Sequence, residues 1–129
     1  MAKRKSVSDG YLNQLWRKAV LIEWNYTDPI SGHRDPTGES LQCHHIVYRR
    51  HFLLRWDYKN GIPLTVESHH FAHTAEGRRQ IDELVDTAYL YYMERQHKKE
   101  YLMDCGMSEN EFRLSMKRDL LERIESCVS

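Results

Sequence analysis

The chain has 129 residues, of which 40% are hydrophobic and 29% charged, with a formal net charge of zero; this length suits one domain with its own core. A zero net charge argues against nucleic-acid binding by overall charge alone, since nucleic-acid-binding proteins are more often basic. Three widely spaced cysteines form no CxxC pair, and no apolar stretch approaches the ~20 residues of a membrane span. The composition thus excludes a disulfide framework and a transmembrane protein, and it favours the cytoplasm.

The first third of the chain is predicted to hold a basic arm, one amphipathic helix and a turn-rich segment. Residues 1–9 contain the run Lys-Arg-Lys and are expected to form a flexible basic arm. Ser8 or Asp9 can cap a helix over residues 10–24, where apolar side chains recur at helical spacing. Residues 27–40 are rich in proline, glycine, serine and aspartate, which is typical of turns.

Two short strands are predicted in the middle of the chain. Residues 41–48 mix β-branched and aromatic side chains between turn signals, which indicates a strand. A basic, aromatic loop over residues 49–58 follows. The Asn-Gly pair at residues 60–61 is a turn signal, and the residues Ile-Pro-Leu-Thr-Val at 62–66 predict a second strand.

Three helices are predicted in the remainder. Thr65 or Ser68 can cap a short helix that ends near Gly77. Apolar side chains between residues 81 and 92 recur at helical spacing and predict one long helix. A capping box, S-x-x-E, at residues 108–111 precedes a last helix. This order of elements predicts one α+β domain with a small hairpin.

Histidines gather between the two predicted strands and the short helix. Six of the eight histidines lie here: His44, His45, His51, His69, His70 and His73. His69 and His73 are four residues apart, so on a helix they share one face and can bind one ion. His70 and His73, three apart, are the weaker alternative pair.

His44 and His45 are neighbours on a predicted strand, so their side chains point to opposite faces. One can complete a three-histidine metal site and the other can act as a base beside it; the residues alone leave open which does which. An ion with an open coordination position next to an imidazole suits hydrolysis, because the imidazole takes a proton from water while the ion stabilises charge. An all-imidazole shell suits Zn, Ni, Co or Mn better than Mg, which prefers oxygen ligands.

The spacing of these residues resembles the HNH nuclease motif. His45 is followed by Asn60 after fifteen residues, Asn60 by His69 after nine, and His69 by His73 after four. That motif belongs to a ββα-metal fold, in which two strands and a helix hold one divalent ion. The paired histidines with N-x8-H-x3-H are similar to the nuclease domains of DNase colicins.

The resemblance implies a role for each matching residue. His44 matches the first metal ligand, which is an aspartate in many HNH enzymes. His69 and His73 match the two ligands carried by the helix. His45 matches the general base, and Asn60 matches the asparagine that pins the loop and orients that base.

A second resemblance covers residues 10 to about 100. The stretch QCHHIVYRRHFLLRWDYKNG looks like phage recombination endonucleases of the NinG (Rap) type. It implies a ββα-metal core at about residues 41–76, an N-terminal helix and two long C-terminal helices, in a single nuclease-like domain over 10–129. It also implies a phage-encoded enzyme of DNA recombination or processing in the cytoplasm of a bacterial host.

The chain departs from this family at the positions of a structural zinc. Many such relatives hold the hairpin with two CxxC pairs, which fall here at Asp28, Ser31, Thr65 and Ser68. We therefore expect no structural zinc. The scaffold is expected to depend on hydrophobic packing instead, by Trp16, Trp24, Ile46, Phe52, Leu54 and Leu64.

These observations predict a metal-dependent DNA endonuclease with one divalent ion (Zn, Ni, Mn or Mg) and DNA as partner, whether duplex, nicked or branched. Arg49, Arg50 and Arg55 are candidates to hold the phosphate backbone. An alternative is a non-cleaving, metal-stabilised module that binds DNA or a protein, with the C-terminal helices free to oligomerise. A nuclease of RNA is a third reading, since this chemistry does not itself select the sugar.

Overall fold

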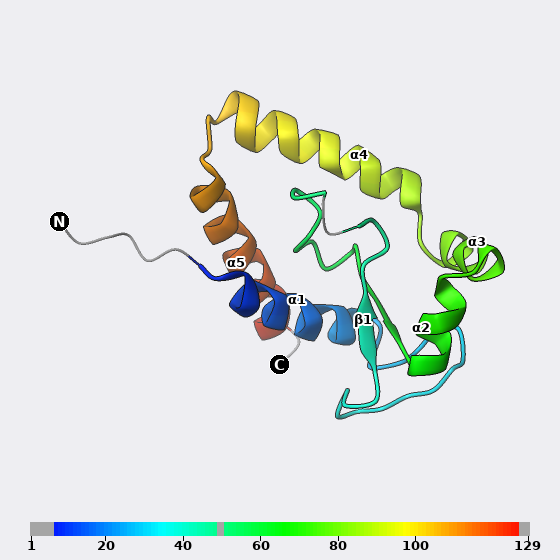
Figure 1. The fold of residues 1–129 in the computed structure, drawn as a ribbon. Coiled ribbons are helices and arrows are strands. Elements are labelled where there is room, and N and C mark those ends of the chain that lie inside the picture. The colour runs from blue at the N-terminus through cyan, green and yellow to red at the C-terminus, as the bar shows by residue number, and fades with distance from the viewer. Residues whose placement is uncertain (1–6, 49–50, 127–129) are drawn as a thin grey trace.

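The computed structural model describes residues 7–48 and 51–126. Its elements follow in the order α1 (Asp9–Glu23), β1 (Gln42–His44), β2 (Ile62–Leu64), α2 (Val66–Ala72), α3 (Ala75–Leu84), α4 (Thr87–His97), the π-helix η1 (Lys98–Asp104) and α5 (Glu109–Ser126). This mixture of helices with a two-stranded sheet is the predicted α+β class (Figure 1). None of the helices in the described part of the chain is long and apolar enough to cross a membrane.

The two strands pair antiparallel, but the first is shorter than predicted. Its pairing runs from Gln42 opposite Leu64 to His44 opposite Ile62 and ends there, although residues 41–48 were expected to be a strand. Beyond His44 a side chain replaces the ladder, because Asn60 Oδ1 accepts a hydrogen bond from the Val47 N–H at 2.7 Å. The chain therefore leaves the sheet directly after His44.

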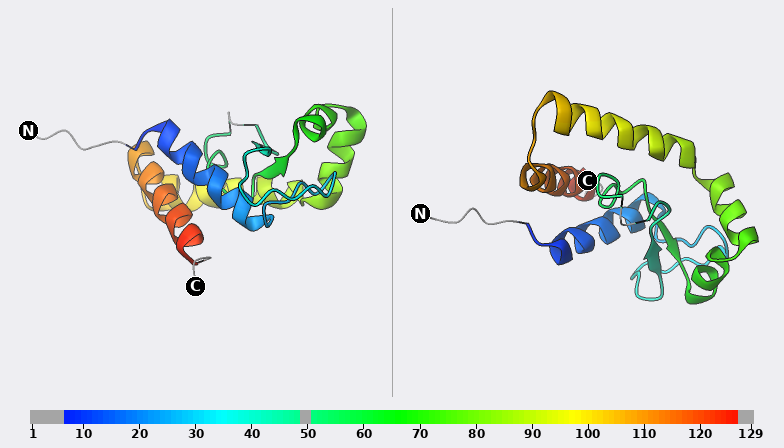
Figure 2. Two further views of the ribbon diagram at one scale, coloured as in Figure 1. Left: turned by 90° about the horizontal axis from the view of Figure 1, so that it is seen from below. Right: turned by 45° about the horizontal axis from the view of Figure 1, so that its top comes forward.

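The largest core cluster lies between α1 and α5, which pack against each other (Figures 1 and 2). Leu12 and Val20 of α1 and Phe112 and Leu120 of α5 are almost completely buried in it. Trp56, from the loop before β2, is 1% exposed and joins the same cluster. α1 and α5 thus enclose part of the loop between β1 and β2.

Two smaller clusters hold the opposite side of the molecule. One joins Ile62 and Leu64 of β2 to α2 and α3, and the other joins Val47 and Leu54 to Leu90 of α4. The loop before β2 therefore lies between α1 and α4 (Figure 2). The predicted packing residues take part as expected: Trp16, Leu54 and Leu64 are buried, and Trp24, Ile46 and Phe52 pack partly buried against the clusters.

The segment predicted as one long helix is two helices. α3 ends at Leu84, Val85 is extended with φ −131°, and Asp86 accepts a hydrogen bond from the Tyr89 N–H as the N-cap of α4. An aspartate that bonds to the backbone competes with helix continuation, which explains the break. The last helix starts as predicted, because the Ser108 hydroxyl and the Glu111 N–H and carboxylate form the capping box.

The end of the predicted basic arm is packed. Ser8 caps α1, which begins at Asp9, and Val7 is 8% exposed. Arg113 of α5 donates to the Val7 carbonyl oxygen at 2.6 Å and 3.1 Å. Residues 7–9 therefore belong to the folded domain, while residues 1–6 lie outside the described part of the chain.

A buried carboxylate occupies the place where the family resemblance puts a zinc site. Asp28 is fully buried, and its Oδ1 accepts hydrogen bonds from the N–H groups of Ile30 and Ser31. Its Oδ2 accepts from both the N–H and the hydroxyl of Thr65, at 2.9 Å and 3.0 Å. Burial raises the pKa of Asp28, but these bonds and one from Ser68 outweigh it and lower the pKa to about 2.

The Asp28 network joins the turn-rich segment to the start of α2. Thr65 is also the N-cap of α2, since its hydroxyl accepts from the Ser68 N–H at 3.2 Å. Hydrophobic packing was expected to hold this part of the scaffold by itself. Charge-assisted hydrogen bonds to one carboxylate add to it, and they set where α2 begins.

Candidate metal centre

Three histidines from β1 and α2 lie close enough together to hold one metal ion. One nitrogen of each of His44, His69 and His73 lies within 4.8 Å of the others. The ring centroids are 5.1 Å to 5.5 Å apart. His70 is not part of the cluster, so the structure brings together the pair with four-residue spacing and not the alternative pair.

Local structure explains how these rings meet. α2 places His69 and its C-cap His73 one turn apart on a single face. The sheet register puts His44 at the last pair of the hairpin, and β2 leads directly into α2 through Thr65. Of the two neighbouring histidines, His44 is therefore the one that faces the helix.

Gln42 fixes the orientation of His69. Gln42 lies two residues before His44 on the same face of β1, and its Oε1 is 2.6 Å from His69 Nδ1. An amide oxygen accepts, so Nδ1 carries the hydrogen and Nε2 keeps the lone pair for a ligand. Gln42 was not among the predicted site residues, although its two-residue spacing from His44 is the signal that identifies it.

The environment favours the neutral form of two of these rings, His44 and His69, and neutral imidazole is the form that a metal needs. Burial, with the neighbouring His69, His73 and His45 rings, lowers the pKa of His44 from 6.5 to about 4. Burial and the adjacent His73 and His70 also lower the pKa of His69. A neutral imidazole offers a lone pair to a cation, so the donor set fits one divalent transition metal.

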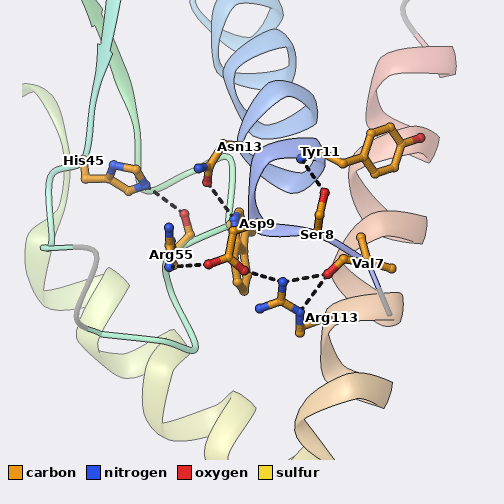
Figure 3. Close-up of polar contacts among 9 residues, drawn as sticks. Val7, Ser8, Asp9, Tyr11, Asn13, His45, Arg55 and Arg113 are labelled. Carbon is orange, nitrogen blue, oxygen red and sulfur yellow. Dashed lines mark hydrogen bonds and ion pairs between the residues drawn. The ribbon is translucent and has the colours of Figure 1, made fainter. Parts of the chain in front are cut away.

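His45 lies outside the cluster, and its ring contacts Trp16 and Arg55. Its ring stacks on Trp16 with centroids 3.9 Å apart and planes inclined by 4°. Its Nε2 lies 2.9 Å from the carbonyl oxygen of Arg55 (Figure 3). A carbonyl only accepts, so Nε2 carries the hydrogen and Nδ1 of the neutral ring carries the basic lone pair.

Asn60 shapes the loop that supplies this carbonyl. The Asn60 side chain is completely buried and bonds to both the N–H and the carbonyl oxygen of Val47, and its amide also donates to the Leu54 carbonyl at 3.1 Å. Leu54 directly precedes Arg55. The contacts thus fit the pinning role that the resemblance implies for Asn60.

Of the three arginines proposed to hold phosphate, only Arg55 lies in the described part of the chain. Arg49 and Arg50 lie outside the described residues. Arg55 is only 23% exposed, its Nη1 lies 3.4 Å from Asp9 Oδ2 (Figure 3), and its guanidinium packs over Trp56. These contacts engage the charge of Arg55 within the protein, and its phosphate role stays a prediction.

The cluster opens onto two hollows in the surface. The larger, about 600 Å³, is lined by all four site histidines together with Trp16, Arg17, Gln42 and Tyr48 among others. The smaller, about 150 Å³, adjoins His44 and His73 on the side of α3. Tyr48 contributes to both hollows and is 60% exposed, so an aromatic ring stands at the edge of the cluster.

Taken together, the described residues form a candidate metal centre with a second, separately held imidazole beside the same hollow. Three protein ligands leave a metal coordination positions for water or an anionic group, as in catalytic sites. Comparisons with protein-family models, curated proteins and solved structures found no match to this chain.

Proposed function

We propose that this protein is a metal-dependent endonuclease that hydrolyses phosphodiester bonds in DNA. One observation carries the proposal: His45, with its Nε2 committed to the Arg55 carbonyl, lines the same hollow as the His44, His69 and His73 cluster. A base and a Lewis-acid site at one surface are the two parts that this hydrolysis requires.

The order of the elements supports a more specific fold assignment than the α+β class. β1, β2 and α2 follow one another within residues 41–76, and the cluster lies where the hairpin meets the helix. This agrees with a ββα-metal core of the HNH type, which the spacing of the histidines resembles. The same resemblance supports a phage-encoded enzyme of recombination or DNA processing in a host cytoplasm.

In the proposed mechanism, His45 acts as general base. Its Nδ1 takes a proton from water, the resulting hydroxide attacks phosphorus, the bond from phosphorus to the 3′ oxygen breaks, and the departing 3′ oxygen takes up a proton from solvent. A divalent ion on the three histidines would supply electrostatic stabilisation for the charge that develops on the phosphoryl and leaving oxygens. The Arg55 carbonyl would stabilise His45 as an imidazolium once the proton has moved.

Plasmid cleavage tests the proposal. Supercoiled DNA is incubated with the wild-type protein and with Mn, Zn, Ni or Mg, and nicked and linear products are quantified. His45→Ala is expected to lower the rate about 10²- to 10⁴-fold while metal binding is retained. Undiminished cleavage by His45→Ala would rule out this mechanism. Duplex DNA, branched DNA and single-stranded RNA as parallel substrates identify the nucleic acid.

The second candidate is a metal-stabilised module that binds DNA or protein without cutting. The zero net charge and the internal ion pair of Arg55 with Asp9 favour it, because both reduce the positive charge offered to a phosphate backbone. Melting temperatures that rise with metal, together with no nicking of any DNA or RNA form, would support this module over the nuclease.

A further inference from the structure

One face of α1 is bonded to three consecutive residues of the loop before β2. Asp9, Asn13 and Trp16 are spaced four and then three residues apart, so they lie on one side of the helix. Each bonds to the next loop residue in turn: Asp9 to the Arg55 guanidinium at 3.4 Å, Asn13 Oδ1 to the Trp56 indole N–H at 3.0 Å, and the Trp16 indole N–H to the Asp57 carbonyl at 2.9 Å.

The same stretch holds the ring of His45. The Arg55 carbonyl bonds to His45 Nε2 (Figure 3), and Trp16 stacks on the ring face. Both contacts are therefore made by members of the interface between α1 and the loop. A shift of the loop relative to α1 would separate the Arg55 carbonyl, at the edge of the His45 ring, from the Trp16 indole, at the face of that ring.

From this geometry we infer that α1 is part of the active site, with Asp9, Asn13 and Trp16 acting as positioning residues for His45. The inference rests on the proposed role of His45 as general base. Asp9 and Asn13 act on the plane and tautomer of His45 through Arg55 and Trp56, and Trp16 acts through its bond to Asp57 and its own stacking on the ring. Proton transfer requires that the base be aligned with the attacking water, so loosening the loop slows the chemical step more than substrate binding.

The C-terminal helix completes this arrangement. Arg113 of α5 pairs with Asp9 and also packs over Trp56. Asp9 therefore joins α1, α5 and the loop at one carboxylate (Figure 3). Trp56 is 1% exposed, so its indole N–H would be buried without a partner if Asn13 were removed.

A purely stabilising role is the competing explanation, and the chain offers matched controls for it. Glu23 of α1 pairs with Arg123 of α5 at 2.8 Å, as Asp9 does with Arg113, but it makes no bond to the loop residues 55–57. Trp24 donates its indole N–H to the Gly61 carbonyl at 3.0 Å, as Trp16 does to Asp57, but it does not stack on His45.

The first experiment compares the steady-state kinetics of DNA nicking by the metal-loaded protein. The test variants are Asp9→Asn, Asn13→Ala and Trp16→Phe, and the controls are Glu23→Gln and Trp24→Phe. We expect the test variants to lower kcat about 10- to 100-fold with little change in KM, and the controls to stay within about twofold at a similar loss of melting temperature. Equal losses of kcat in test and control variants would overturn the inference.

The second experiment needs no activity. Nitrogen-15 NMR of the histidine rings at pH 8 reports the tautomer of His45, which is expected to be Nε2–H in the wild type and in both controls. Trp16→Phe and Asn13→Ala are expected to shift it towards a mixture. If the wild type cleaves nothing yet this shift appears, the nuclease proposal fails and the positioning role stands. An unchanged tautomer in the test variants would overturn the positioning role.

Discussion

Oε1 of Gln42 lies 2.6 Å from Nδ1 of His69, and this contact leaves Nε2 as the nitrogen of His69 that keeps its lone pair for a ligand. The strand thereby contributes both a candidate ligand, His44, and the partner that orients a second ligand. Partners of this kind raise the basicity of a ligating imidazole and fix its tautomer.

Gln42→Ala is therefore expected to weaken metal binding about 10- to 100-fold, which is typical for loss of an outer partner. Isothermal titration with Zn and Mn measures the affinity. Gln14→Ala, at an exposed position of α1, is the control and is expected to bind as the wild type does. Equal affinities for all three proteins would mean that Gln42 does not orient His69.

The three histidines of α2 and its C-cap should differ sharply in their effect on metal affinity. His69→Ala and His73→Ala each remove a candidate ligand, so each is expected to weaken metal binding by more than the ~10- to 100-fold of an outer partner. His70→Ala changes a side chain outside the cluster and is expected to leave the affinity unchanged. Loss of binding in His70→Ala alone would place the ion elsewhere.

Asp28 should make the stability of the fold depend on pH in the acid range. Its pKa is about 2 in the folded protein and 3.8 in the reference state, so its contribution is present above pH 3.8 and is lost as the pH falls towards 2. The difference corresponds to about 2 kcal/mol.

Chemical unfolding of the wild type and of Asp28→Asn between pH 6 and pH 2 measures this contribution. The free energies of unfolding should differ most above pH 4 and converge as the wild-type carboxylate takes up its proton. A difference that stays constant over the whole range would show that the charge of Asp28 does not stabilise the fold.

Asn60→Ala is expected to destabilise the protein by at least about 2 kcal/mol, because it leaves the Val47 N–H and the Leu54 carbonyl buried without this partner. Urea unfolding measures the loss. Metal affinity, measured under conditions where the variant is folded, is expected to change little, since Asn60 does not contact the cluster. A large fall in metal affinity would show that the loop also controls the ligands.

Several features of the fold could be predicted because they depend on neighbours along the chain. The capping box at Ser108 and Glu111, the start of α1 near Ser8 and the Thr65 cap of α2 follow from which side chains bond to a nearby backbone. Prediction from the local sequence failed where two signals favoured different structures for the same segment. Around Val85 the apolar spacing favoured a continuous helix, but Asp86 capped a new one.

The proximity of His69 and His73 was likewise determined by the sequence itself, because four residues make about one turn of any α-helix. Which of His44 and His45 joins them was decided only by the tertiary structure, since this depends on the register and on where the strand leaves the sheet. The bonds of Asp28 to Thr65, and of the α1 face to residues 55–57, join segments far apart in the chain. No local spacing encodes such contacts; they exist because packing of the helices brings those backbones together.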